Sequence, residues 1–311
     1  MAVNFFGLGS SSSELSTQKT SHNLFQAIVI FSVISLLIMS LSRIGLSLWQ
    51  AERVSDAQGW GYILLQGLRV DFASLCWLWG IAALGTVVFA GEHLVGRVWL
   101  MILRVWLTLG LWVVVFLEAS SPSFIAEYGF RPNRLYVEYL VYPKEVLSML
   151  WAGRKGELIL SALITVGTLW GGWWLSGKLT QYIRFPKWYW RPVLAVIVIA
   201  ITVLGARSSL GHRPLNPSLV AFSDDPLVNS LVLNSSFSLI FAIKQMSNEE
   251  DASKVYGKLA DEKVIDIVRR ESGRPLSAFT SSTIPTLSFN QASYTGKPKN
   301  LVIILQESLG A

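Results

Sequence analysis

The residue best placed to do chemistry stands near the end of the sequence, in KNLVIILQESLGA at 299–311. Residues 301–305 form an apolar run with the length and β-branched content of a strand buried on both faces. Glu307 follows this run, and ligands of open α/β sheets sit just beyond the carboxyl ends of strands. The position predicts a carboxylate that binds a hard cation through its oxygens, and the alternative is a buried strand followed by a solvated turn.

The same segment resembles the first strand and first metal-ligand motif of the lipoteichoic-acid-synthase-like phosphoglycerol transferases, which belong to the alkaline phosphatase and sulfatase superfamily. The shared pattern is Asn300, the hydrophobic run, Glu307 and Ser308. The resemblance implies that Glu307 is a ligand of a divalent metal (Mn, Mg or Zn) and that residues 299–311 are the first strand of a sulfatase-like domain. The family's Thr or Ser nucleophile and its later Asp and His ligands would lie downstream. We therefore assign no catalytic residue here and expect residues 1–311 alone to be inactive.

A second candidate set lies in the segment 119–156, where basic and aromatic side chains are mixed. Its members are Arg131, Arg134, Lys144, Tyr128, Tyr136, Tyr139 and Tyr142. Because a guanidinium can hold a phosphate with two parallel hydrogen bonds, we predict that Arg131 and Arg134 bind a phosphoglycerol headgroup. The alternative is an ordinary amphipathic segment at the membrane surface.

Three further ionisable residues stand within or beside apolar stretches. Asp71 and Glu118 lie near the ends of two such stretches and are candidates for holding a lipid headgroup or a cation, with Asp71 taken as a substrate-binding residue. The alternative, which the pattern favours, is that both are interfacial charges in water. Arg104 lies six residues into an apolar stretch, where charge is costly and indicates function, although an arginine so near the interface can also extend to lipid phosphate.

The composition indicates a membrane protein with several spans. Of the 311 residues, 52% are hydrophobic and 15% charged, and the mean hydropathy is +0.46. The thirteen tryptophans agree, because tryptophan favours membrane interfaces. The net charge of +6 does not indicate nucleic acid, since the basic residues stand in short loops, and anionic lipid headgroups are the expected partner.

Five apolar stretches are long enough to cross a bilayer: 23–42, 70–90, 98–118, 157–176 and 192–206. They predict a five-helix transmembrane domain at 23–206, preceded by a disordered tail at 1–22. We interpret the first stretch as an uncleaved anchor rather than a cleaved signal peptide. The spacing Gly167-x-x-x-Gly171 in the fourth stretch predicts close helix packing.

The orientation is predicted from the basic segment 177–191, which has no acidic residue, together with the resemblance. Counts of basic residues over all loops do not favour the orientation that we predict. We expect a multi-pass protein of the bacterial cytoplasmic (inner) membrane, with a cytoplasmic N-terminus and the C-terminal part outside.

Residues 207–298 are predicted to be an extracytoplasmic connector. Its apolar run at 229–243 is either a sixth span or an interfacial or re-entrant helix, and its fifteen residues favour the second. Residues 249–271 are predicted to form an amphipathic helix. Residues 272–298 are rich in Ser, Thr, Pro and Gly and are predicted to be a linker.

The predicted class is therefore an α-helical membrane protein with five transmembrane helices, a connector and the start of an α/β domain. The resemblance implies a membrane-bound enzyme that moves phosphoglycerol from phosphatidylglycerol to a glycan or polyglycerolphosphate acceptor outside the membrane. One alternative is a non-catalytic, lipid-binding or regulatory relative. A transporter is disfavoured by the odd number of spans and the lack of an internal repeat.

Overall fold

The structure is a computed structural model that describes residues 23–181, 187–208, 215–247 and 257–291, with positions 293, 295–297, 300 and 302–304. The chain divides into two compact units, Met1–Asn248 and Glu249–Ala311. The first unit contains the apolar helices, and the second contains the segment that precedes Glu307.

Five helices of the first unit are long and apolar enough to cross a membrane. They are α1 (Gln26–Trp49), α3 (Trp60–Phe89), α4 (Leu94–Tyr128), α7 (Lys155–Thr180) and α8 (Arg191–Arg207). Each overlaps one predicted apolar stretch, so the prediction of an α-helical protein with five candidate spans is confirmed.

Helix α4 is longer than predicted, and the boundary placed at residue 119 is wrong. The helix continues through Ser120, Ser121 and Pro122 to Tyr128. Both serine hydroxyls donate to the Leu117 carbonyl within the helix, so these polar residues need no loop. With 35 residues, α4 is about 52 Å long and exceeds a bilayer core of about 30 Å.

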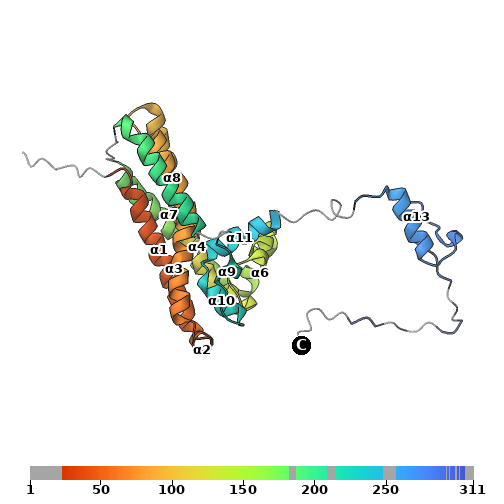
Figure 1. Cartoon of the computed structure of the whole chain (residues 1–311). Helices are drawn as coiled ribbons and strands as arrows, with labels where there is room; N and C mark the ends of the chain where they lie inside the picture. The colour runs from red at the N-terminus through yellow and green to blue at the C-terminus, as the bar shows by residue number, and fades with distance from the viewer. Residues whose placement is uncertain are drawn as a thin grey trace, which may run out of the picture. The chain divides into compact units, whose positions relative to one another are not determined.

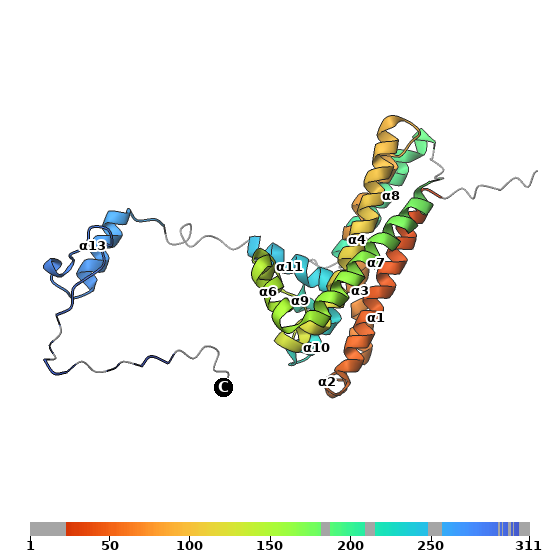
Figure 2. The same cartoon turned by 180° about the vertical axis from the view of Figure 1, so that it is seen from behind.

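Helices α1, α3 and α4 pack against one another, and α7 and α8 flank them, α7 along α4 and α8 along α3 (Figures 1 and 2). The shared core is apolar, with Phe31 of α1 edge-on to Trp79 of α3 at 6.2 Å between ring centroids. Few residues of α7 and α8 are buried, and their outward side chains are mostly large and apolar. This pattern suits helices that face lipid.

The predicted packing role of Gly167 and Gly171 is wrong within this chain. No atom of the described residues lies within 4 Å of a Cβ built at either position. The close approaches of α7 occur instead at Gly172, beside Thr108, and at Gly177, beside Arg104. The reason is that the face of α7 turned towards α4 carries the second pair of glycines.

A group of short helices gathers at the end of the bundle where α2 (Ala51–Asp56) joins α1 to α3 (Figure 1). The group comprises α5 (Arg134–Val141), α6 (Pro143–Gly153), α9 (Pro217–Val220), α10 (Pro226–Val232) and α11 (Ser235–Ser247). Helices α10 and α11 cover the apolar run predicted at 229–243, and they are bent by 107° at their junction. The run is therefore not one straight sixth span, in agreement with the re-entrant interpretation.

Helix α10 packs its apolar face between α1 and α3. Leu227, Val228, Leu231 and Val232 are buried in one cluster with Val70 of α3. Asp225 begins the helix: its side chain accepts from the Leu227 and Val228 N–H groups and pairs with both Nε and Nη2 of Arg53 at 2.7 Å. Burial alone would raise the pKa of Asp225, but the hydrogen bonds from Arg53 and these N–H groups lower it below its ordinary value.

The second unit contains α13 (Asp261–Glu271), which confirms the later half of the helix predicted at 249–271. Residues 257–260 are not helical, so the prediction is wrong there, and residues 249–256 lie outside the described residues. The segment after α13 is not an unstructured linker throughout, because Arg269 donates to the Pro285 carbonyl at 2.8 Å and Phe279 forms an antiparallel bridge with Ser288.

The strand predicted at 301–305 is not seen in the part of it that the structure describes. Val302, Ile303 and Ile304 are in neither helix nor strand, and their side chains are 79%, 73% and 85% exposed. A strand needs neighbours to pair its backbone groups, and the described residues of this unit contain no strand beyond one isolated bridge. Glu307 and Ser308 lie outside the described residues.

Candidate functional site

Four charged side chains are buried at the level where the α10–α11 junction meets the long helices. They are Arg43 of α1, Asp71 of α3, Glu118 of α4 and Arg131 of the α4–α5 connection, with exposed fractions of 1%, 0%, 4% and 1%. Burying an unpaired charge is very costly, so such groups must be neutralised by partners. The four residues form two ion pairs, and we call them together the buried charge network.

The first pair joins α1 to α3. Both terminal nitrogens of Arg43 donate to the carboxylate of Asp71, at 2.6 and 2.5 Å. Asn234, at the α10–α11 junction, donates from Nδ2 to Asp71 Oδ1 at 3.0 Å and to Ser74 Oγ at 2.9 Å. This forked geometry is the strongest form of arginine–carboxylate contact, and it fixes the distance between the two helices.

The second pair joins α4 to the residues that follow it. Arg131 Nη1 donates to Glu118 Oε2 at 2.8 Å and to Ser235 Oγ at 3.1 Å. Glu118 also accepts from Ser42 Oγ of α1 at 2.5 Å and from the backbone N–H of Ser235 at 2.8 Å. A carboxylate at the first N–H of a helix is favourable because it meets the positive end of the helix dipole.

The network therefore holds the α10–α11 junction in place from two sides. Asn234 Oδ1 accepts from the Phe237 N–H at 2.8 Å and so begins α11, while its Nδ2 contacts Asp71. The next residue, Ser235, contacts Glu118 and Arg131. Two adjacent residues of one bend thus connect to both ion pairs.

The network lies about one bilayer thickness from the opposite end of the bundle. At the helical rise, Arg43 is about 26 Å from the start of α1 and Asp71 about 27 Å from the end of α3. A bilayer core is about 30 Å thick. If these helices cross a membrane, the charges stand close to one membrane–water boundary, where a lipid headgroup meets its acyl chains.

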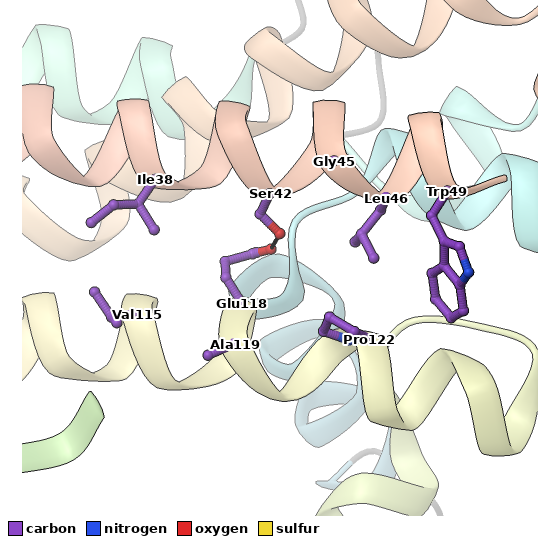
Figure 3. Close-up of a pocket in the computed structure, with 9 residues that line it drawn as sticks. All are labelled: Ile38, Ser42, Gly45, Leu46, Trp49, Val115, Glu118, Ala119 and Pro122. Carbon is purple, nitrogen blue, oxygen red and sulfur yellow. Dashed lines mark hydrogen bonds between the residues drawn. The ribbon is translucent and has the colours of Figure 1, made fainter. Parts of the chain in front are cut away.

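An open groove lies between α1 and α4 beside the second pair, with a volume of about 470 Å³. Figure 3 shows its lining: Ile38, Ser42, Gly45, Leu46 and Trp49 from α1, with Val115, Glu118, Ala119 and Pro122 from α4. Ser42 and Glu118 meet across the groove midway along it, and apolar side chains lie on both sides of them. We call this the α1–α4 groove.

The structure places the three predicted substrate-binding residues in different surroundings. Asp71 and Arg131 are buried and paired within the protein, whereas Arg134 is half exposed and pairs with Glu138 one helical turn later, at 2.7 Å. They do not converge on one surface. Their role in headgroup binding stays a prediction, but the interpretation of Asp71 and Glu118 as solvated interfacial charges is wrong, because tertiary packing removes both from water.

Sequence reasoning did not select Ser42, Arg43, Asn234 or Ser235. Arg43 directly follows the first apolar stretch, and Asn234 lies within the apolar run at 229–243. A usable signal was present: opposite charges at the ends of successive apolar stretches must be neutralised by one another.

Arg104 contacts helix α7 within the protein. Its Nε and Nη2 donate to the Trp173 carbonyl of α7 at 3.3 and 3.0 Å, and its guanidinium lies 3.8 Å from the centroid of the Trp173 ring. Gly177 gives it room, since a Cβ there would be 2.7 Å from Arg104 Nη2. Arg104 thus connects α4 to α7.

The described residues do not form a site for the divalent metal that the resemblance implies. Within the described ranges, no three His, Cys, Asp or Glu side chains gather so that they could hold a metal ion. The one predicted ligand, Glu307, lies outside the described residues.

Comparison with known proteins does not place the chain in a family. No family model matches the sequence, and no solved structure matches it. The class of protein is therefore defined by the fold alone: a multi-pass α-helical membrane protein with two buried ion pairs at one end of its bundle.

The close fit of Arg43 against α3 gives a first prediction. A Cβ at Gly67 would lie 2.2 Å from Arg43 Nε and 2.4 Å from Cζ, and the paired guanidinium cannot move away without leaving Asp71. We expect Gly67→Ala to destabilise the membrane unit by about 1–3 kcal/mol, as overpacking does. Reversible unfolding in mixed micelles measures the change.

The matched control is Gly61→Ala on the same helix, where a Cβ meets no atom within 4 Å. Alanine there should leave stability unchanged or raise it by up to about 1 kcal/mol through helix propensity. Equal effects of the two substitutions would contradict the assigned packing.

Proposed function

We propose that this chain is the membrane part of a phosphoglycerol transferase similar to lipoteichoic acid synthase. Phosphoglycerol passes from phosphatidylglycerol to a glycan or polyglycerolphosphate acceptor outside the bacterial cytoplasmic membrane, and diacylglycerol remains. The segment 299–311, with Asn300, Glu307 and Ser308, is the first strand of a sulfatase-like catalytic domain, and Glu307 is a ligand of Mn, Mg or Zn.

The order of parts is the observation that carries this proposal. Five candidate spans come first, then helices at one end of the bundle, then a separate unit that leads to Glu307. In such an enzyme the lipid donor is in the bilayer, so the membrane unit keeps the catalytic domain at the surface where the donor's headgroup stands.

The test uses the natural gene product in its own membranes. Its intact mass, compared with 34.5 kDa for residues 1–311, decides whether a catalytic domain follows. Diacylglycerol release from labelled phosphatidylglycerol is then measured with Mn, Mg or Zn supplied.

We expect Glu307→Gln to lower this release by at least about 100-fold. Substituting a direct metal ligand lowers activity more than substituting the residues that orient it. Glu271→Gln, at an exposed carboxylate of α13, is the matched control and should leave the rate unchanged. No turnover by the natural product, or full turnover by Glu307→Gln, would overturn the proposal.

The α1–α4 groove favours a second candidate, a non-catalytic membrane relative that binds lipid and regulates a partner. The groove supports lipid binding whether or not a catalytic domain follows. In this case Glu307→Gln leaves the cellular phenotype of the gene unchanged, whereas substitutions in the groove alter it.

A further inference from the structure

The α1–α4 groove lies at the surface of the bundle. The side chains of α1 next to it are large, apolar and exposed: Val33, Leu37, Leu41, Ile44 and Leu48. Its volume of about 470 Å³ falls within the range of roughly 300–1,000 Å³ that is typical of small-molecule sites. Both walls of the groove belong to helices that are long and apolar enough to span a membrane. An acyl chain is therefore compatible with the apolar lining of the groove.

Gly45 keeps the groove open on the α1 side. It is one of the lining residues, and a Cβ built there meets no atom within 4 Å. A larger side chain at this position would therefore extend into empty groove without a clash against its own protein. This property makes Gly45 a position from which the groove can be filled.

The polar floor of the groove, midway along it, offers acceptors from Ser42 and Glu118, and the indole N–H of Trp49 is a donor elsewhere in the lining. Ser42 gives its only hydroxyl proton to Glu118, so both lone pairs of its oxygen remain as acceptors. Glu118 accepts three hydrogen bonds, from Ser42, Arg131 and Ser235, of the roughly four that a carboxylate can accept. Arg131 is behind Glu118 and does not line the groove.

These groups select the chemistry of the ligand. A hydroxyl group can donate to Ser42 and Glu118, whereas a phosphate offers only acceptor oxygens and a negative charge that faces a carboxylate. The complementary ligand is thus a neutral lipid with a free hydroxyl close to its acyl chains.

We propose that the α1–α4 groove binds diacylglycerol, with one acyl chain along the apolar lining and the free hydroxyl donating to the Ser42–Glu118 pair. The inference rests on the proposed function, because diacylglycerol is what remains of phosphatidylglycerol when phosphoglycerol is transferred. The groove then holds this product before it enters the bilayer.

The test measures binding without turnover. The full chain of residues 1–311 is placed in phosphatidylcholine nanodiscs with a photoactivatable diacylglycerol, and the labelled peptides are mapped. We expect label on the α1 and α4 peptides that contain Ser42 and Glu118. Unlabelled diacylglycerol should compete at least about tenfold more strongly than phosphatidylglycerol or added phosphatidylcholine.

Gly45→Leu should reduce labelling at least about tenfold, because its side chain occupies the groove. Gly167→Leu is the matched control: it is also an open helix glycine with no atom within 4 Å, and it lies outside the groove. It should leave labelling unchanged, and the two variants should unfold at similar temperatures.

Equal competition by phosphatidylcholine, equal or stronger competition by phosphatidylglycerol, or full labelling of Gly45→Leu would each overturn the proposal. None of these results bears on phosphatidylglycerol turnover by the natural gene product. Failure of this inference is therefore distinguishable from failure of the proposed function.

Discussion

Asp71→Ala is expected to destabilise the membrane unit by about 3–5 kcal/mol, the cost of leaving a buried charge without its partner. Arg43 is 1% exposed, and its guanidinium would lose both of its hydrogen bonds to the carboxylate. Asn234 Nδ2 would lose one of its two acceptors as well. Unfolding by denaturing detergent in mixed micelles gives the free energy directly.

The double variant Arg43→Met, Asp71→Leu tests whether the cost comes from charge rather than from lost volume. Replacing both members of a buried pair by apolar residues is often close to neutral. We expect the double variant to be more stable than Asp71→Ala by at least about 2 kcal/mol. A double variant as unstable as the single one would show that the ion pair itself is not what the fold requires.

The second large effect is expected at Glu118. Glu118→Gln removes the negative charge that neutralises Arg131, and Arg131 also keeps Nε and Nη2 buried without a partner among the described residues. We expect a loss of about 3–5 kcal/mol. The start of α11 should also loosen, because one amide oxygen cannot accept from the Ser235 N–H and from Ser42 and Arg131 together, and the amide NH2 would face a donor.

Cysteine labelling measures the loosening separately from overall stability. Ser236 is buried at the start of α11, and the chain's single cysteine, Cys76, is buried as well. In a Cys76→Ala background, a thiol introduced by Ser236→Cys should react slowly with maleimide, and at least about tenfold faster after Glu118→Gln.

Glu138→Gln is the control for this experiment. It breaks the ion pair between Arg134 and Glu138, whose side chains are 51% and 44% exposed. The loss of stability should be no more than about 1 kcal/mol. It should not change the labelling of the introduced thiol. Equal labelling in all three backgrounds would refute the assigned contact between Glu118 and α11.

The positions of the five spans follow from the sequence, because a stretch of about twenty apolar residues is a local property that a bilayer selects. Their ends do not follow in the same way. The third apolar stretch ends at 118, yet α4 continues through Ser120, Ser121 and Pro122, since the two hydroxyls bond within the helix. The fifteen residues of the run at 229–243 favoured an interfacial or re-entrant helix but did not locate the bend between α10 and α11.

The candidate site was determined by tertiary structure. Asp71 and Arg131 were selected from the sequence for their charge, but their surroundings were not foreseen. Asp71 is 28 residues from Arg43 and 163 from Asn234, and no local pattern indicates those contacts. Apolar length determines which segments enter the membrane, whereas neutralisation of a buried charge depends on which helices become neighbours.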